Sequence, residues 1–275
     1  MAGLTAAEGL PAAAGLPAAA GLPAAALFIV VSMALAALTA ILLVTTPARW
    51  LHDASHSAEV TGSRAFRPWL LVLIGVLIAG AAALSVASDL LTALAWTATA
   101  PGSGTTFAPL APNWVDLALT VLLLGAVAGA TPVLIVTDLL VRRLPDRIVY
   151  PLIGLTCAVI VTGILLGASP RWWFALAWAA AGLALFGGLH LLGRVLRRPT
   201  MGLGDVKLAF VVAGLAGLVD PWAPALVLVL TMLIAGVWAI LAGLRAGSLA
   251  GVTIAFGPAM LTGLWVGSVS APFVL

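Results

Sequence analysis

Charged residues are scarce in this sequence of 275 residues, making up 8% of it, whereas hydrophobic residues make up 63%. A soluble domain carries about 25% charged residues, so this composition excludes an ordinary water-soluble protein. Apolar runs long enough to cross a bilayer recur along the chain. We therefore expect an all-α fold, a polytopic bundle of membrane helices, because helices satisfy every backbone hydrogen bond within lipid.

Cysteine is almost absent, since Cys157 is the only one in the chain. One cysteine excludes both an internal disulfide framework and a zinc site built from cysteines. The formal charge of +3 is small, and the arginines lie at the ends of the apolar runs. We therefore expect no nucleic-acid partner, and the surroundings that the composition does indicate are the lipid bilayer. Nothing in the sequence indicates an oligomeric state.

Eight apolar segments are predicted to span the membrane. They lie at about residues 26–46, 69–89, 115–138, 149–167, 172–193, 206–219, 224–243 and 251–271. If the first loop faces the cytoplasm, 11 of the 12 cationic residues fall on that side and only Arg171 falls on the other. By the positive-inside rule this orients the bundle with both termini outside.

Three regions follow from this pattern. Residues 1–25 contain a GLPAAA hexamer that repeats up to position 26, and its regular prolines predict a low-complexity, partly extended lead-in rather than a helix. Residues 26–110 carry two spans and the loop 47–68. Residues 111–275 carry the other spans and the residues that are candidates for chemistry.

Two aspartates lie at the ends of spans on the same predicted side of the membrane. Asp138 ends a long apolar run, and Asp205 follows the segment GLG and opens another. Ionisable residues at membrane depth are costly and usually functional. The remaining acids are interpreted as helix-start, turn, interface or loop residues; they include Asp116, Asp220, Asp89, Asp53 and Glu59.

As a pair, Asp138 and Asp205 predict a carboxylate dyad. Two carboxyl groups a few Å apart share one proton, so one acts as a base while the other acts as an acid. Asp205 lies at a helix start, where the helix dipole favours the ionised form, and Asp138 lies near a helix end, where it favours the protonated form. We therefore expect Asp205 to be the base and Asp138 the acid of a coupled pair.

The segment around Asp205 has other unusual features. Gly202 and Gly204 permit positive φ angles and close backbone approach, which would let the loop dip into the membrane beside an extended substrate. Lys207 is the only lysine among the 12 cationic residues. It is either an ammonium group near the dyad or the lipid headgroups, or a lysine retained by chance.

Three segments resemble motifs of the type IV prepilin peptidases, also called leader peptidases. The string GLGDVKL at 202–208 resembles the family's GxGD-x-K-L motif. Asp138, followed after five residues by LPD, is similar to the D-x5-I-P-N segment, and FGP at 256–258 resembles the FGP element of the last span. The supporting motif residues are Gly202, Gly204, Lys207, Pro145, Asp146, Gly257 and Pro258.

The resemblance implies an intramembrane aspartyl endopeptidase, a hydrolase of the prokaryotic inner membrane. It would cut the basic leader from prepilins or pseudopilins at the cytoplasmic face, after a glycine, in type IV pilus assembly or protein secretion. Asp138 and Asp205 would be its catalytic residues, activating water without a metal, a cofactor or a covalent intermediate.

Two departures from the family pattern are visible. Aspartate replaces asparagine at position 146, where we expect it to cap the following helix. The loop 47–68 lacks the four-cysteine zinc insertion of larger members. Methylation of the new pilin N-terminus with S-adenosylmethionine, which many larger members perform, is therefore not expected.

The histidines offer weaker signals. His52 and His56 have a spacing that binds metal only on a helix with a further ligand, and a solvated loop is the simpler interpretation. His190 is expected to be a packing or interface residue.

Two alternative functions stay open. Paired acids also occur in proton- or cation-coupled transporters, although such paths place acids near the midplane and often show repeated halves. The presenilin and signal-peptide-peptidase type shares GxGD, but its first aspartate follows tyrosine, whereas Thr137 precedes Asp138 here.

Overall fold

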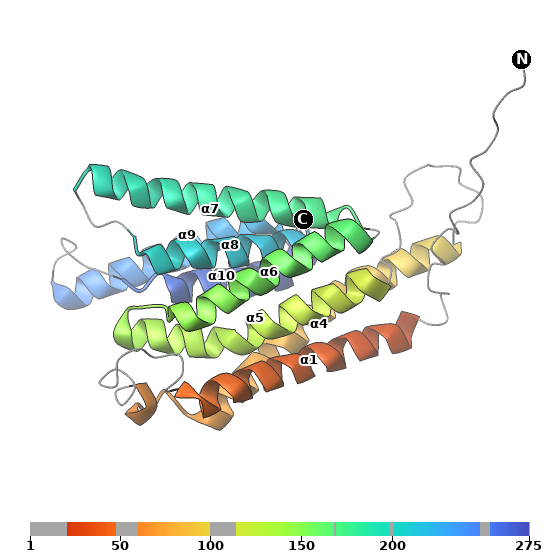
Figure 1. Ribbon diagram of the computed structural model, residues 1–275, viewed down its shortest axis with the longest axis horizontal. Helices are drawn as coiled ribbons and strands as arrows, with labels where there is room; N and C mark the ends of the chain where they lie inside the picture. The colour runs from red at the N-terminus through yellow and green to blue at the C-terminus, as the bar shows by residue number, and fades with distance from the viewer. Residues whose placement is uncertain are drawn as a thin grey trace, which may run out of the picture.

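The computed structural model describes residues 21–47, 60–99, 114–167, 169–197, 201–247 and 254–274, without the side chains of 21–22, 88–99 and 272–273. Eight long helices account for most of these residues, and no strand occurs among them. They are α1 (Gly21–Thr45), α4 (Pro68–Thr99), α5 (Trp114–Val141), α6 (Asp146–Leu166), α7 (Arg171–Val195), α8 (Leu203–Val219), α9 (Ala223–Ala246) and α10 (Gly257–Val274) (Figure 1). The predicted all-α class is confirmed.

Six of these helices are long and apolar enough to cross a membrane, namely α1, α4, α5, α6, α7 and α9. The protein is therefore a multi-pass membrane protein. Helix α8 has only 17 residues and α10 has 18. At 1.5 Å per residue, α8 is roughly 26 Å long, shorter than the hydrocarbon core of about 30 Å. The predicted count of eight full spans is therefore not established.

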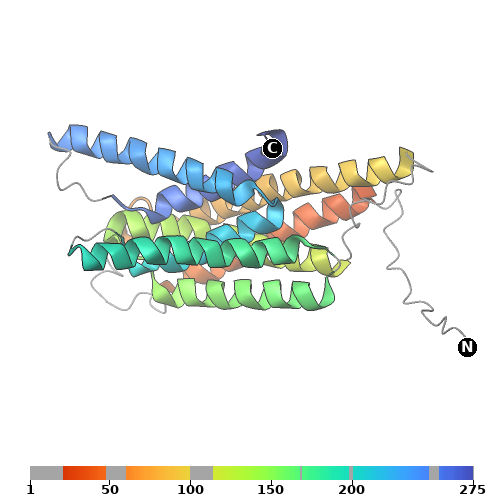
Figure 2. The ribbon, with the colours of Figure 1, turned by 90° about the horizontal axis from the view of Figure 1, so that it is seen from above.

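The helices run roughly along one direction and alternate in sense. The C-terminal ends of α1, α5, α7 and α9 lie at the same end of the bundle as the N-terminal ends of α4, α6, α8 and α10 (Figures 1 and 2). We call this the site end, because both Asp138 and Asp205 belong to it. The arrangement brings the end of α5 and the beginnings of α6, α8 and α10 together, although they are far apart in the sequence.

Helices α5 and α8 form the centre of the bundle and bury most of their residues. Small residues let their neighbours approach closely, as is common between membrane helices. A Cβ at Gly129 of α5 would overlap the carbonyl oxygen of Ala36 in α1. A Cβ at Gly182 of α7 would lie 2.8 Å from the Cβ of Ala213 in α8. Packing this tight fixes the two helices that carry the acids.

Three helices start at other residues than predicted, and each of these starts has a proline beside it or in its first turn. Helix α1 starts at Gly21, so the third GLPAAA copy is helical and the prediction of an extended segment is wrong there. Pro23 lies in the first turn, where its missing N–H costs no helical bond. Helix α6 starts at Asp146, directly after Pro145. Helix α10 starts at Gly257, six residues later than predicted, with Pro258 in its first turn.

Candidate active site

Asp138 lies at the end of α5 and is only 5% exposed. The helix ends three residues later, at Val141, and Arg142, which follows it, has a left-handed φ of 54°. The N–H of Arg142 donates to the carbonyl of Asp138 at 2.9 Å, which closes the last turn. This turn leads the chain into the connection to α6 and holds Asp138 inside the bundle while the basic residues after it reach the surface.

The start of α10 meets the Asp138 carboxylate. The backbone N–H of Gly257 donates to Oδ2 of Asp138 at 3.1 Å. This amide is available because a helix leaves its first N–H groups without partners inside the helix. A Cβ at position 257 would lie 2.8 Å from the same oxygen, closer than real Cβ atoms come. Glycine at position 257 therefore lets the Asp138 carboxylate approach the start of α10 closely, and the FGP resemblance did not specify this contact.

Asp205 lies in the first turn of α8 and is partly buried. The N-cap residue is Gly202, in extended conformation, and its backbone hydrogen-bonds the Asp205 carboxylate. Asp205 lies close enough to Asp138 for the two carboxylates to repel each other when both are ionised. The structure therefore brings together the two acids that the sequence paired, each with a backbone amide from a helix start.

Leu144 occupies the space between the motif segments. A Cβ at Gly204 would lie 3.2 Å from the Cβ of Leu144, and one at Gly257 would lie 3.4 Å from its Cδ2. Neither Gly202 nor Gly204 has a positive φ angle, so of the two properties that glycine permits, the left-handed conformation is not used here. What Gly204 provides is close approach to Leu144, which joins the start of α8 to the segment after α5.

Lys207 has defined partners on α6. Its Nζ lies 2.6 Å from Oδ1 of Asp146 and 4.3 Å from the ring centroid of Tyr150, the only tyrosine of the chain. We call these three residues the α6–α8 clasp. Asp146 makes no capping bond, since Pro145 is the N-cap of α6 and no side chain caps it, so the predicted capping function is wrong. The acid pairs with Lys207 instead.

His190 ties the end of α7 to the segment before α8. Its Nδ1 lies 2.9 Å from the carbonyl oxygen of Met201, immediately before the GLGD string. The predicted interface histidine is therefore confirmed. Phe186, one turn earlier, packs against Phe256 with ring centroids 5.9 Å apart. Leu144 and Tyr150 were not singled out, although Tyr150 is unique and lies one helical turn after Asp146.

The other acids behave largely as predicted. Asp116 lies in the first turn of α5, is 4% exposed, and accepts a 2.6 Å hydrogen bond from the indole N–H of Trp172. Asp220 accepts the N–H of Trp222 at 2.7 Å in the turn before α9. His52, His56, Asp53 and Glu59 lie outside the described residues, as does the side chain of Asp89.

The comparison with protein families bears on the functions left open by the sequence. The model of the type IV leader peptidase family matches residues 125–243, a segment that contains Asp138, the α6–α8 clasp and the GLGD string. This match covers fewer than half of the residues of the chain, and it supports the type IV leader peptidase family. Asp138 and Asp205 both lie in the segment that is similar to this peptidase family, which favours the peptidase prediction over the transporter. No curated protein and no solved structure matches the chain. Gly257 and Pro258 lie beyond the matched segment, and the contact of Gly257 with Asp138 is seen only in the fold.

Proposed function

We propose that this protein is an intramembrane aspartyl endopeptidase that removes the basic leader from type IV prepilins or pseudopilins. The observation that supports it is the convergence of Asp138 and Asp205 at one end of the bundle, within reach of each other's charge. The arginine distribution orients that end toward the cytoplasm of a prokaryotic inner membrane, with both chain termini outside.

The proposed reaction needs only water and the dyad. Asp205 takes a proton from the water molecule as the water oxygen attacks the scissile carbonyl carbon. Asp138 gives its proton to the carbonyl oxygen. The resulting gem-diol then collapses and returns a proton to Asp138. The C–N bond breaks as Asp205 passes the water proton to the leaving nitrogen. The products are a carboxylic acid and an amine, with no metal, cofactor or covalent intermediate.

The structure changes the basis for these two roles. The argument from helix ends considered only the helix of each acid, but Asp138 also receives an N–H from the start of α10. Both carboxylates thus face helix N-termini, so helix dipoles do not distinguish the base from the acid, and another property must. Solvent exposure does distinguish the two acids, because Asp138 is 5% exposed and Asp205 is more accessible. The more enclosed Asp138 is therefore proposed to hold the shared proton.

Co-expression with a prepilin tests the proposal. The unchanged protein should shorten the prepilin by its leader, seen as a gel shift and verified by mass spectrometry of the new N-terminus. Asp138→Ala and Asp205→Ala should leave the precursor intact at equal protein levels. Full processing by either variant would contradict the dyad. Addition of a chelator to the purified protein should leave cleavage unchanged, and its loss would point to a metal instead.

A further inference from the structure

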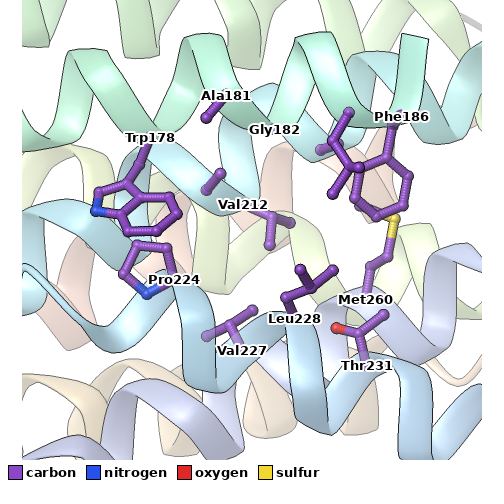
Figure 3. A pocket seen from close by; sticks show the side chains of 13 residues that line it. Trp178, Ala181, Gly182, Phe186, Val212, Pro224, Val227, Leu228, Thr231 and Met260 are labelled. Atoms are coloured by element: carbon purple, nitrogen blue, oxygen red, sulfur yellow. The ribbon is translucent and has the colours of Figure 1, made fainter. Parts of the chain in front are cut away.

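An apolar cavity of about 190 Å³ lies between α7, α8 and α9, closed at one end by Met260 of α10 (Figure 3). None of its lining residues is charged. It extends from Trp178 and Pro224 at one end to Phe186 and Met260 at the other, as Figure 3 shows. Trp178 and Phe186 are eight residues apart on α7, so the cavity is roughly 12 Å long and runs along the helices.

The cavity begins about one helical turn from the candidate active site. On α8, the lining residues Ala209 and Val212 follow Asp205 at i+4 and i+7, so all three share one face of the helix. On α10, Met260 lies one turn after Gly257, whose N–H holds Asp138. The end marked by Phe186 is the end nearer the site, because Phe186 packs against Phe256.

We propose that the α7–α9 cavity is the subsite for the apolar segment of the substrate that follows the scissile bond. This inference rests on the proposed function and adds the position of that segment. When the scissile carbonyl of the substrate lies at the dyad, the apolar segment that follows it extends from the dyad into the bilayer. A cavity that begins one turn below Asp205 and continues about 12 Å into the bundle lies where the segment's first side chains would pass.

The size and chemistry of the cavity agree with side chains rather than a whole helix. A helix is at least about 10 Å wide with its side chains, which a volume of about 190 Å³ cannot hold. A substrate helix would instead lie along the mouth between α7 and α9 and insert the large apolar side chains of one face. Ala181 is exposed and lines the cavity, so it lies at this mouth.

Two matched alanines on α7 test the proposal. Ala181 lines the cavity, whereas Ala184 is equally classed as exposed and does not line it. The probe is a synthetic prepilin with a basic leader, a glycine and an apolar helix of about 20 residues. Ala181→Trp should raise the KM for this probe about tenfold at unchanged kcat, since the indole would exclude one large apolar side chain of the substrate from the cavity. Ala184→Trp should leave both constants unchanged.

A truncated probe and a crosslink identify the occupant. A peptide that lacks the apolar helix should be cleaved equally by both tryptophan variants. A photoreactive phenylalanine analogue at position 181 of the Asp205→Asn protein should crosslink to the apolar segment of the full probe, and at position 184 to lipid. Crosslinks to lipid alone at position 181, or equal KM values for the two variants, would overturn the subsite.

The same design separates this inference from the proposed function. Cleavage of the probe by the unchanged protein is measured first, and its absence would overturn the peptidase activity itself. The crosslink at position 181 does not require cleavage, so it reports the occupant of the cavity in either case.

Discussion

Helix α5 buries a carboxylate at each of its ends, and the two are held in different ways. Asp116, in the first turn, is 4% exposed and receives the indole N–H of Trp172 at 2.6 Å. Asp138, in the last turn, is 5% exposed and receives the backbone N–H of Gly257 at 3.1 Å while facing Asp205. Burial is therefore nearly the same at the two ends, and the partners differ.

This difference shows that burial alone does not mark a catalytic acid. Asp116 joins α5 to α7 through one side-chain hydrogen bond, and Trp172, its donor, is itself fully buried. Asp138 is held by a backbone amide, which no substitution other than proline removes, and a second carboxylate lies within reach of its charge. Like charges placed together cost stability, so such a pair indicates chemistry rather than structural support.

The largest effect is expected when either member of the dyad loses its ability to ionise. Asp138→Asn and Asp205→Asn should each lower kcat for leader removal by about a thousandfold or more, because an amide neither accepts nor donates the proton of the reaction. Their melting temperatures should not fall, since each substitution removes one of two neighbouring carboxyl groups that cannot both ionise without repulsion. Cleavage is followed by mass spectrometry and unfolding by a thermal melt in detergent. Either variant at wild-type rate would remove its residue from the mechanism.

Gly257→Ala is expected to have the next largest effect. The added Cβ would lie 2.8 Å from Oδ2 of Asp138, so the carboxylate or the start of α10 must move. A displacement of this size at a reacting group should lower kcat by about tenfold to a hundredfold. Gly236→Ala is the matched control, because a Cβ there meets nothing within 4 Å. Equal rates for the two variants would show that Gly257 does not hold Asp138 in the active protein.

Much of the fold was predictable because each membrane helix corresponds to a long apolar run in the sequence. The all-α class and the positions of the eight helices follow from those runs, and the boundaries failed mainly where proline sets a helix start, as at Pro145 and Pro258. A hydropathy pattern does not distinguish a helix from a non-helical apolar segment such as 254–256, which precedes α10. That three-residue segment decides where the N–H of Gly257 lies.

The candidate site was predictable in its residues and less so in its contacts. The pairing of Asp138 with Asp205 came from their shared side of the membrane. The partners of Lys207 could not be predicted, because Asp146 and Tyr150 are about 60 residues away in the chain and meet it only through the packing of α6 on α8. The glycines were recognised, but which surface each one approaches depends on tertiary structure.

A smaller effect is expected from the α6–α8 clasp, which we expect to position Asp205 by fixing the start of α8 against α6. The side chains of Lys207 and Asp146 are 22% and 49% exposed, so solvent weakens the ion pair and each contact contributes about 0.5–1 kcal/mol. Lys207→Met should lower kcat about fivefold to tenfold at unchanged KM.

Asp146→Asn supplies the control for the clasp, since the amide oxygen still accepts a hydrogen bond from Lys207. Its kcat should stay within about twofold of the wild-type value. A merely stabilising clasp would instead lower the melting temperature in Lys207→Met while kcat of the folded protein stays unchanged. That result would exclude a positioning function.

The smallest effect on activity is expected at Asp116, and it tests the comparison of the two buried acids most directly. Asp116→Asn keeps the oxygen that accepts the N–H of Trp172, so both cleavage and the melting temperature should stay near wild type. Asp116→Leu leaves that buried N–H without its acceptor and should lower the free energy of unfolding by about 1–3 kcal/mol, with kcat of the folded fraction unchanged. Asparagine should thus replace the acid at one end of α5 and not at the other. If Asp116→Asn abolished cleavage at wild-type stability, the two ends would be coupled and Asp116 would not be only structural.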